Sequence, residues 1–247
     1  MVSIKTKREI AIMSEGGHIL AAILKNISAA AKVGVTTAEL DSLATDLCRQ
    51  HKVRPAFLGF RGYPAALCAS VNNIIVHGIP SNTPLVGGDI VGLDLGVLYK
   101  GFYTDSATTI AVGSISRDAK RLLRATQESL NTAIKIAKEG ITLGDLGSAI
   151  AGVAAKHKLG VVRELTGHGI GRDLQEEPSV PNYGTPGKGL KLKAGMTLAI
   201  EPMFTLGAPD TKVLKDNWSV MIKDSSIGAH FEHTIAIEKT GCRVLTN

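Results

Sequence analysis

Apolar residues near the start of the chain repeat with the spacing of an amphipathic helix. Between residues 6 and 31 they stand at Ile10, Met13, Ile19, Leu20, Ile23, Leu24 and Ile27. These positions fall on one face of a helix, and Gly34 lies just past its end. Thr36 followed by Glu39 is a capping-box pattern, which predicts a second helix that ends near His51.

The rest of the chain alternates between β-rich and helical stretches. Residues 65–113 and 160–247 are β-rich, while Ser116 is expected to cap a long helix to about Lys138 and Thr142 to cap the next helix. Each half, about 1–113 and about 114–247, therefore consists of two helices followed by strands. This order predicts an α+β fold with antiparallel sheet in the middle and helices outside.

An internal repeat supports this division into halves. Ala31–Ser42 matches Ala137–Ser148 at six of twelve positions, at an offset of 106 residues. A glycine that ends one helix and a threonine that caps the next are common in proteins, so this pattern alone explains the shared glycine and threonine. It does not explain why each half also has a carboxylate at a matching position in a later strand. We interpret the chain as a duplicated half-domain. No Ser- or Pro-rich linker divides it, so we expect 1–247 to fold as a single domain.

Carboxylates end two apolar strands in the same way. Gly88–Asp94 and Gly195–Glu201 both run from a glycine through apolar residues to an acid. Lys100-Gly101 fits a two-residue hairpin turn, which places Gly96 opposite Asp105 and puts Asp94 and Asp105 on one face of the sheet. A slip of one residue would separate the two carboxylates.

Further candidate ligands interrupt strand-like sequence near the C-terminal end. The full set is Asp94, Asp105, His168, Glu201 and Glu232. Buried carboxylates need a neutralising partner, and an oxygen-rich set with one imidazole suits Mn²⁺, Fe²⁺ or Co²⁺ better than a structural zinc site. Five such ligands favour a two-metal centre, whose chemistry is that of amide hydrolysis.

Composition narrows the class of protein. The N-terminus lacks an apolar signal core, and no apolar run is long enough to suggest a membrane span. Cys48, Cys68 and Cys242 show no metal-type or disulfide-type spacing, which favours a reduced cytoplasmic setting. The net charge of +6 would attract polyanions, yet aromatic residues make up only 4% of the chain, which argues against a base-stacking surface.

Taken together, these segments resemble type I methionine aminopeptidases over nearly the whole chain. The matching motifs are His77-Gly78-Ile79-Pro80, Asp94 with Asp105, Thr166-Gly167-His168-Gly169-Ile170-Gly171, Ile200-Glu201-Pro202-Met203 and Phe231-Glu232-His233-Thr234. The resemblance implies the pseudo-twofold pita-bread fold and removal of the initiator methionine from nascent chains. It also implies two divalent ions, Mn²⁺, Fe²⁺ or Co²⁺, with Zn²⁺ as a further option.

The resemblance also implies roles for individual residues. Asp94, Asp105, His168, Glu201 and Glu232 would hold the metals, with Asp105 and Glu232 bridging them. Glu201 would move a proton from water to the leaving amine, and His77 would stabilise the tetrahedral intermediate. Phe60, Tyr63, Cys68 and Trp218 fall where the family lines its methionine pocket, although ordinary core packing explains them nearly as well.

Three positions depart from the family pattern. Gln175 replaces a second catalytic histidine, and its amide can donate a hydrogen bond but cannot become cationic. We therefore predict a working but slower enzyme. Gly96 stands where bacterial relatives often have threonine. We expect the glycine at this position to weaken support for the metal. Phe57 stands where many have cysteine, and should reshape the pocket.

Two alternatives remain open from the sequence. An Xaa-Pro peptidase is the first, because Leu93–Val97 and Thr104-Asp105 also resemble that branch. The second is a weakly active or non-catalytic binding protein of the same fold, suggested by Gln175. Basic clusters around Lys5, Lys120 and Lys188 suggest contact with the ribosome surface. We expect a monomer.

Overall fold

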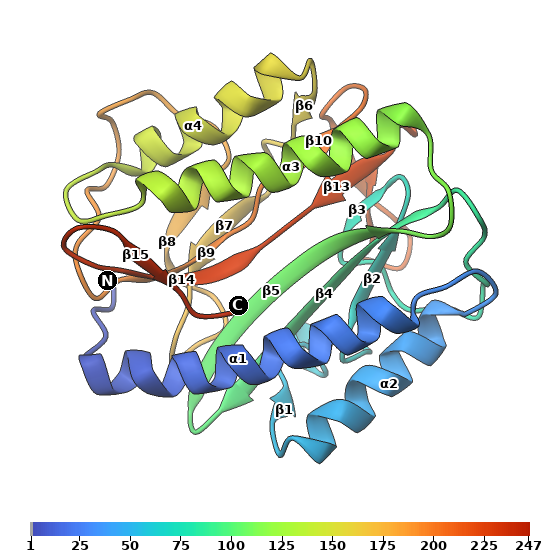
Figure 1. Cartoon of the computed structure of the whole chain (residues 1–247), viewed down its shortest axis with the longest axis horizontal. Helices are drawn as coiled ribbons and strands as arrows, with labels where there is room; N and C mark the ends of the chain where they lie inside the picture. The colour runs from blue at the N-terminus through green and yellow to red at the C-terminus, as the bar shows by residue number, and fades with distance from the viewer. Residues whose placement is uncertain (1) are drawn as a thin grey trace.

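The computed structural model describes residues 2–247 and has the expected α+β architecture. Its α-helices are α1 (Lys7–Ala30), α2 (Thr37–Gln50), α3 (Arg117–Ile136) and α4 (Leu143–Lys156). Helices α1 and α2 lie along one side of the strands, and α3 and α4 along the other (Figure 1). The strands occupy the space between the two helix pairs, as the sequence order predicts.

Within residues 2–247 the strands form four antiparallel sheets. Those of the first half are β1 (Arg54–Pro55), β2 (Cys68–Val71), β3 (Ile74–Val76), β4 (Ile90–Tyr99) and β5 (Phe102–Ala111). Those of the second half are β6 (Gly160–Val161), β7 (Thr166–Gly169), β8 (Glu176–Pro181), β9 (Thr197–Ile200), β10 (Met203–Thr205), β11 (Thr211–Val213), β12 (Val220–Ile222), β13 (Gly228–His230), β14 (His233–Ile237) and β15 (Cys242–Val244). The sheet orders are β1-β4-β2 with β5 beside β4, β13-β10-β6, β11-β12-β3, and β15-β14-β9-β7-β8.

Side-chain caps define where the helices begin. Thr36 and Thr142 each accept a hydrogen bond from the backbone three residues on, as predicted, and each completes a capping box, which was predicted for Thr36 alone. The Ser116 side chain caps α3 by accepting from the N–H of Ala119, without a capping box, and that helix ends at Ile136 rather than near Lys138. The chain leaves the helix at Ala137 because it must turn through Gly140, whose φ is +92°.

The two repeated segments share their backbone geometry as well as their sequence. Gly34 and Gly140 have φ values of +89° and +92°, a region that favours glycine. Their N–H groups donate to the carbonyls of Leu85 and Leu192, respectively. Thr36 and Thr142, 106 residues apart, each form an isolated antiparallel bridge to a later segment. The sequence repeat therefore corresponds to a repeated local structure.

Helix α1 is both long and apolar. By length and composition alone it could cross a membrane, with a mean hydropathy of 1.2, contrary to the expectation from the sequence. In this fold, however, its residues Leu20, Ile23 and Ile27 are fully buried and belong to one cluster with Leu93 and Leu95 of β4. Its packing is that of a core helix.

The β4–β5 hairpin has the predicted register. Gly96 pairs with Asp105, and Asp94 pairs with Ala107. The turn residues Lys100 and Gly101 both have positive φ, +48° and +86°, as a two-residue turn with right-handed strand twist requires. The hairpin therefore brings both aspartates to one face of the sheet.

Candidate metal centre

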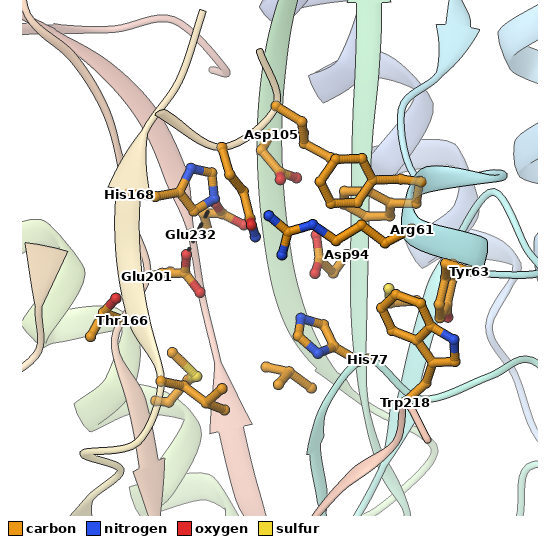
Figure 2. A pocket seen from close by; sticks show the side chains of 18 residues that line it. Arg61, Tyr63, His77, Asp94, Asp105, Thr166, His168, Glu201, Trp218 and Glu232 are labelled. Carbon is orange, nitrogen blue, oxygen red and sulfur yellow. Dashed lines mark ion pairs between the residues drawn. The ribbon is translucent and has the colours of Figure 1, made fainter. Parts of the chain in front are cut away.

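Two of the five predicted ligands come from this hairpin. The side chains of Asp94 and Asp105 are buried and face the same cavity. Oδ1 of each carboxylate is buried with no hydrogen-bond partner. Figure 2 shows both side chains pointing from β4 and β5 toward the middle of the site.

Glu201 and Glu232 lie at two facing strand breaks. Glu201 lies between β9 and β10, and Glu232 lies between β13 and β14. The strand pairs that flank these breaks are Ile200 with His233 and Met203 with His230. The two segments thus cross between the five-stranded and the three-stranded sheet at the same level, in opposite directions. The two glutamates are brought together because each occupies the break in its own strand.

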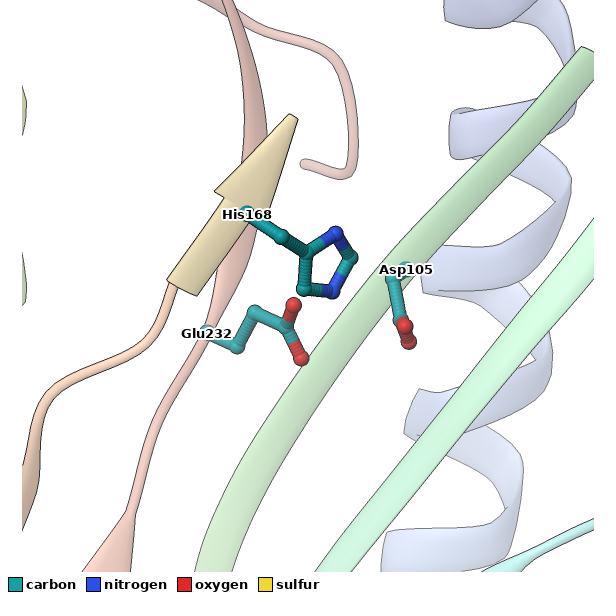
Figure 3. Close-up of side chains that lie close together, drawn as sticks. All are labelled: Asp105, His168 and Glu232. Atoms are coloured by element: carbon teal, nitrogen blue, oxygen red, sulfur yellow. The ribbon is translucent and has the colours of Figure 1, made fainter. Parts of the chain in front are cut away.

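His168 completes the set from β7. Its Nδ1 lies 2.8 Å from the carbonyl oxygen of Gly169, so Nδ1 carries the proton and Nε2 is left with a free lone pair. Ligand atoms of His168, Asp105 and Glu232 all lie within 4.8 Å of one another (Figure 3). A Cβ on the neighbouring Gly167 would lie 2.3 Å from the carbonyl oxygen of Ala199, which explains the glycine on this strand.

The four carboxylates repel one another in a desolvated site. Burial, and then the neighbouring acids, raise the pKa of Asp94 and of Glu232 well above their ordinary values. Burial likewise raises the pKa of Asp105 and of Glu201 to about 7. Within residues 2–247, no lysine or arginine lies within ion-pair distance of any of them. Unpartnered oxygens beside one imidazole are the donor set that divalent cations of intermediate hardness prefer.

The acids form one wall of a cavity of about 170 Å³. All the other predicted site residues also line it: His77, Phe60, Tyr63, Cys68, Trp218 and Gln175. The Tyr63 hydroxyl donates to the Gly78 carbonyl, at 2.9 Å, and the Tyr63 ring meets that of Trp218 edge to face at 5.1 Å. The aromatic side chains therefore form a rigid apolar wall beside the carboxylates (Figure 2).

His77 lies between the aromatic wall and the acids (Figure 2). Its backbone has a φ of +58°, a strained conformation for a residue with a side chain and one that is concentrated at functional sites. Burial lowers the pKa of its imidazole to about 4. The ring is therefore neutral near pH 7, with one N–H available to donate.

Several residues of the site were not found from the sequence. Leu174 and Met203 line the cavity next to predicted residues. Arg61 points into the cavity between the acids and the aromatic wall, from a turn in which its φ is +50° (Figure 2). The flanking glycines Gly59 and Gly62, both with positive φ, were the available signal for such a turn.

His230 was also missed. It is 3% exposed, and its Nε2 lies 3.5 Å from Oε2 of Glu201. Burial lowers the pKa of its imidazole to about 4. The signal in the sequence was its place two residues before Glu232.

Comparison with known proteins agrees with this geometry. A family model for metallopeptidase family M24 matches residues 11–239. The chain is 44% identical to methionine aminopeptidase 1 of Bacillus subtilis, covering 100% of this chain and 99% of the relative. It is 42% identical to methionine aminopeptidase of Escherichia coli, covering 99% and 94%.

Solved structures give the same result. The crystal structure of methionine aminopeptidase from Rickettsia prowazekii matches with a TM-score of 0.98 at 40% identity, over 100% of both chains. Prolidase from Pyrococcus furiosus matches with a TM-score of 0.79 at 24% identity, but only 65% of that chain is covered, so it shows a shared fold alone.

These neighbours share the pita-bread fold, which confirms the predicted fold class. The full-length match to methionine aminopeptidases does not favour the Xaa-Pro alternative. A family of metallopeptidases implies divalent metal ions and a hydrolytic reaction, as the buried acids suggest. The chain belongs to metallopeptidase family M24 and, within it, to the methionine aminopeptidases.

Proposed function

We propose that this protein removes the N-terminal methionine from nascent polypeptides by metal-dependent hydrolysis of the first peptide bond. The observation that carries the proposal is the buried group of carboxylates with unpartnered oxygens, next to a cavity with an apolar wall. One wall can hold metal ions and the other a thioether side chain. An apolar, polarisable slot suits methionine.

Five residues would hold two divalent ions. These are Asp94, Asp105, His168 through Nε2, Glu201 and Glu232. The donor set favours Mn²⁺, Fe²⁺ or Co²⁺, with Zn²⁺ as a further option. When bound, such ions lower the pKa of water and polarise a carbonyl group.

The protein side chains would supply positioning and proton transfer. Glu201 takes a proton from the water that attacks the scissile carbonyl carbon, and returns it to the amine as the carbon–nitrogen bond breaks. His77, neutral at this pH, donates a hydrogen bond near the scissile amide and stabilises the tetrahedral intermediate. Gln175 contributes an amide donor where a histidine could also carry charge.

The methionine side chain would occupy the apolar end of the cavity. Phe60, Tyr63, Cys68 and Trp218 contact it there, and the edge-to-face pair of Tyr63 and Trp218 keeps this wall rigid. Leu174 adds apolar surface next to Gln175. A preformed slot reduces the entropy lost when the substrate binds.

We propose further that residues 1–247 act as a single catalytic domain of two pseudo-symmetric halves, about 1–113 and 114–247. The shared geometry at Gly34 and Gly140 supports this division. The domain would work in the cytoplasm as a monomer and meet nascent chains at the ribosome through its exposed basic residues. Lys5 is not one of these, because it is buried and paired with Glu176. Co-sedimentation with ribosomes should then weaken as salt is added; salt-independent binding would count against an electrostatic contact.

The central experiment compares peptides and metals. Metal-depleted protein is reloaded with Mn²⁺, Fe²⁺, Co²⁺ or Zn²⁺ and assayed on Met-Gly-type and Xaa-Pro-type peptides. We expect release of methionine only, and its loss in Asp105→Asn. The matched control is Asp118→Asn, an exposed aspartate on α3. Cleavage of Xaa-Pro peptides alone would overturn the substrate, and full activity of Asp105→Asn would overturn the metal centre.

A further inference from the structure

The carboxylate of Glu201 lies between two imidazoles. Its Oε1 is 3.7 Å from Nε2 of His168, and its Oε2 is 3.5 Å from Nε2 of His230. His168 lines the cavity, whereas His230 does not. His230 therefore approaches Glu201 without itself lining the cavity.

The main chain of His230 is fixed on two sides. His230 pairs with Met203 of β10, and Met203 lies two residues after Glu201. Its N–H donates to Oγ1 of Thr109, at 3.0 Å, and its carbonyl accepts from the same hydroxyl, at 2.7 Å. Strands β5 and β10 thus hold His230 beside Glu201.

The ring nitrogen that faces Glu201 has no other partner. Nε2 of His230 is buried and makes no hydrogen bond within residues 2–247. An unpaired buried polar atom is destabilising. The Glu201 oxygen at 3.5 Å needs only a few tenths of an ångström of movement to reach hydrogen-bond distance of about 3.0 Å.

We propose that His230 is a positioning residue that holds the Glu201 carboxylate through an Nε2–H···Oε2 hydrogen bond. The bond fixes rotation of the carboxylate, so that Oε1 stays turned toward His168 and the cavity. Hydrogen-bond partners of a metal ligand or catalytic base fix its orientation, and the chemistry of that ligand or base depends on this orientation. His230 belongs to neither the ligand set nor the substrate pocket described above, and this inference rests on the proposed function.

Two substitutions separate positioning from packing. His230→Gln keeps a nitrogen donor at about the reach of Nε2, whereas His230→Met keeps volume without a donor. We expect His230→Met to lower kcat about 10- to 100-fold with KM nearly unchanged, and His230→Gln to recover most of that loss. The matched control is His233→Met, since the His233 ring forms a hydrogen bond with Thr246 and does not line the metal cavity. The kcat of this variant should stay near that of the unchanged protein.

Binding and spectroscopy provide readouts that do not depend on turnover. Calorimetric titration with Mn²⁺ should show weaker binding in His230→Met and near-normal binding in His230→Gln. In the unaltered protein, nitrogen-15 NMR should detect a protonated Nε2 on His230 whose shift changes in Glu201→Gln. This second measurement requires no His230 variant to fold.

The outcomes are distinct. Equal kcat and Mn²⁺ affinity in His230→Met and the unaltered protein would overturn the proposal, as would a His230→Gln variant no better than His230→Met. An Nε2 signal that does not respond to Glu201→Gln would also overturn it. If the unaltered protein failed to release methionine from any peptide, the proposed function would fall, while the NMR experiment would still test the contact.

Discussion

A Cβ on Gly96 would lie 3.0 Å from Cε1 of Phe57. The Phe57 ring lines the cavity and lies against the strand that carries Asp94. Gly96 and Phe57 both depart from the family pattern, and because they pack against each other the two departures belong together. The phenylalanine ring fills the space that a threonine side chain at position 96 would need.

Gly96→Thr should destabilise the fold. The added side chain would also meet Cβ of Ala56, at 2.9 Å, and such overpacking costs about 1–3 kcal/mol. Phe57→Cys alone should cost about 3 kcal/mol through the cavity that it leaves. The double variant should lose less than the sum, because each change relieves the other. Urea unfolding of all four proteins measures this, and simple additivity would contradict the coupling.

Gln175→His should make the enzyme faster. An imidazole can donate a hydrogen bond and also carry a proton, and general acid–base catalysis of this kind contributes at least about 100-fold in favourable cases. We expect kcat to rise about tenfold or more, with Mn²⁺ affinity unchanged. Gln175→Asn, which retains the amide on a shorter side chain, is the control and should be slower than the unaltered protein. Unchanged turnover in Gln175→His would show that position 175 does not take part in catalysis.

The metal-free protein should lose stability as the pH rises from about 4 to 7. The pKa of Asp105 and of Glu201 is raised to about 7 in the fold, whereas unfolded carboxyls titrate near about 4. The lowered pKa of His77 and of His230 acts in the opposite sense, but the pKa of Asp94 and of Glu232 is raised as well. The four acids outnumber the two imidazoles, so the folded state binds more protons in this window and raising the pH favours the unfolded state. Adding Mn²⁺ above pH 7 should reverse the loss.

Thermal unfolding at a series of pH values, with and without Mn²⁺, checks this. Glu232→Gln removes one of the repelling charges, so the metal-free variant should be more stable above pH 7 than the metal-free unaltered protein, although it should bind metal poorly. A melting temperature that rises with pH in the metal-free protein would contradict the prediction.

Lys5→Met should loosen the loop that carries Gln175. The side chains of Lys5 and Glu176 are 2% and 11% exposed and form an ion pair. Glu176 also accepts hydrogen bonds from the backbone of Arg172 and Asp173. Removing one partner of a buried pair costs about 3–5 kcal/mol. Urea unfolding should show this loss, together with a lower kcat.

The matched control for that experiment is Lys7→Met, because Lys7 is exposed two residues away. Its stability should change by less than about 0.5 kcal/mol. Equal effects of the two substitutions would mean that the Lys5–Glu176 pair does not hold the loop.

The features that could be predicted from the sequence are local ones. The caps at Thr36, Ser116 and Thr142 follow from hydrogen bonds within one helical turn. The register of Gly96 with Asp105 follows from a two-residue turn, since such a turn fixes every pair along the hairpin. The internal repeat and the five candidate ligands could also be proposed without coordinates, because each acid interrupts apolar sequence in which a lone charge would be unfavourable.

Tertiary structure decided how these residues meet. Glu201 and Glu232 converge only because Ile200 pairs with His233 and Met203 with His230. The packing of Phe57 against Gly96, the entry of Arg61 into the cavity and the approach of His230 to Glu201 all depend on long-range packing. Spacing along the chain sets which residues share a face, whereas the pairing of distant strands sets which faces come together.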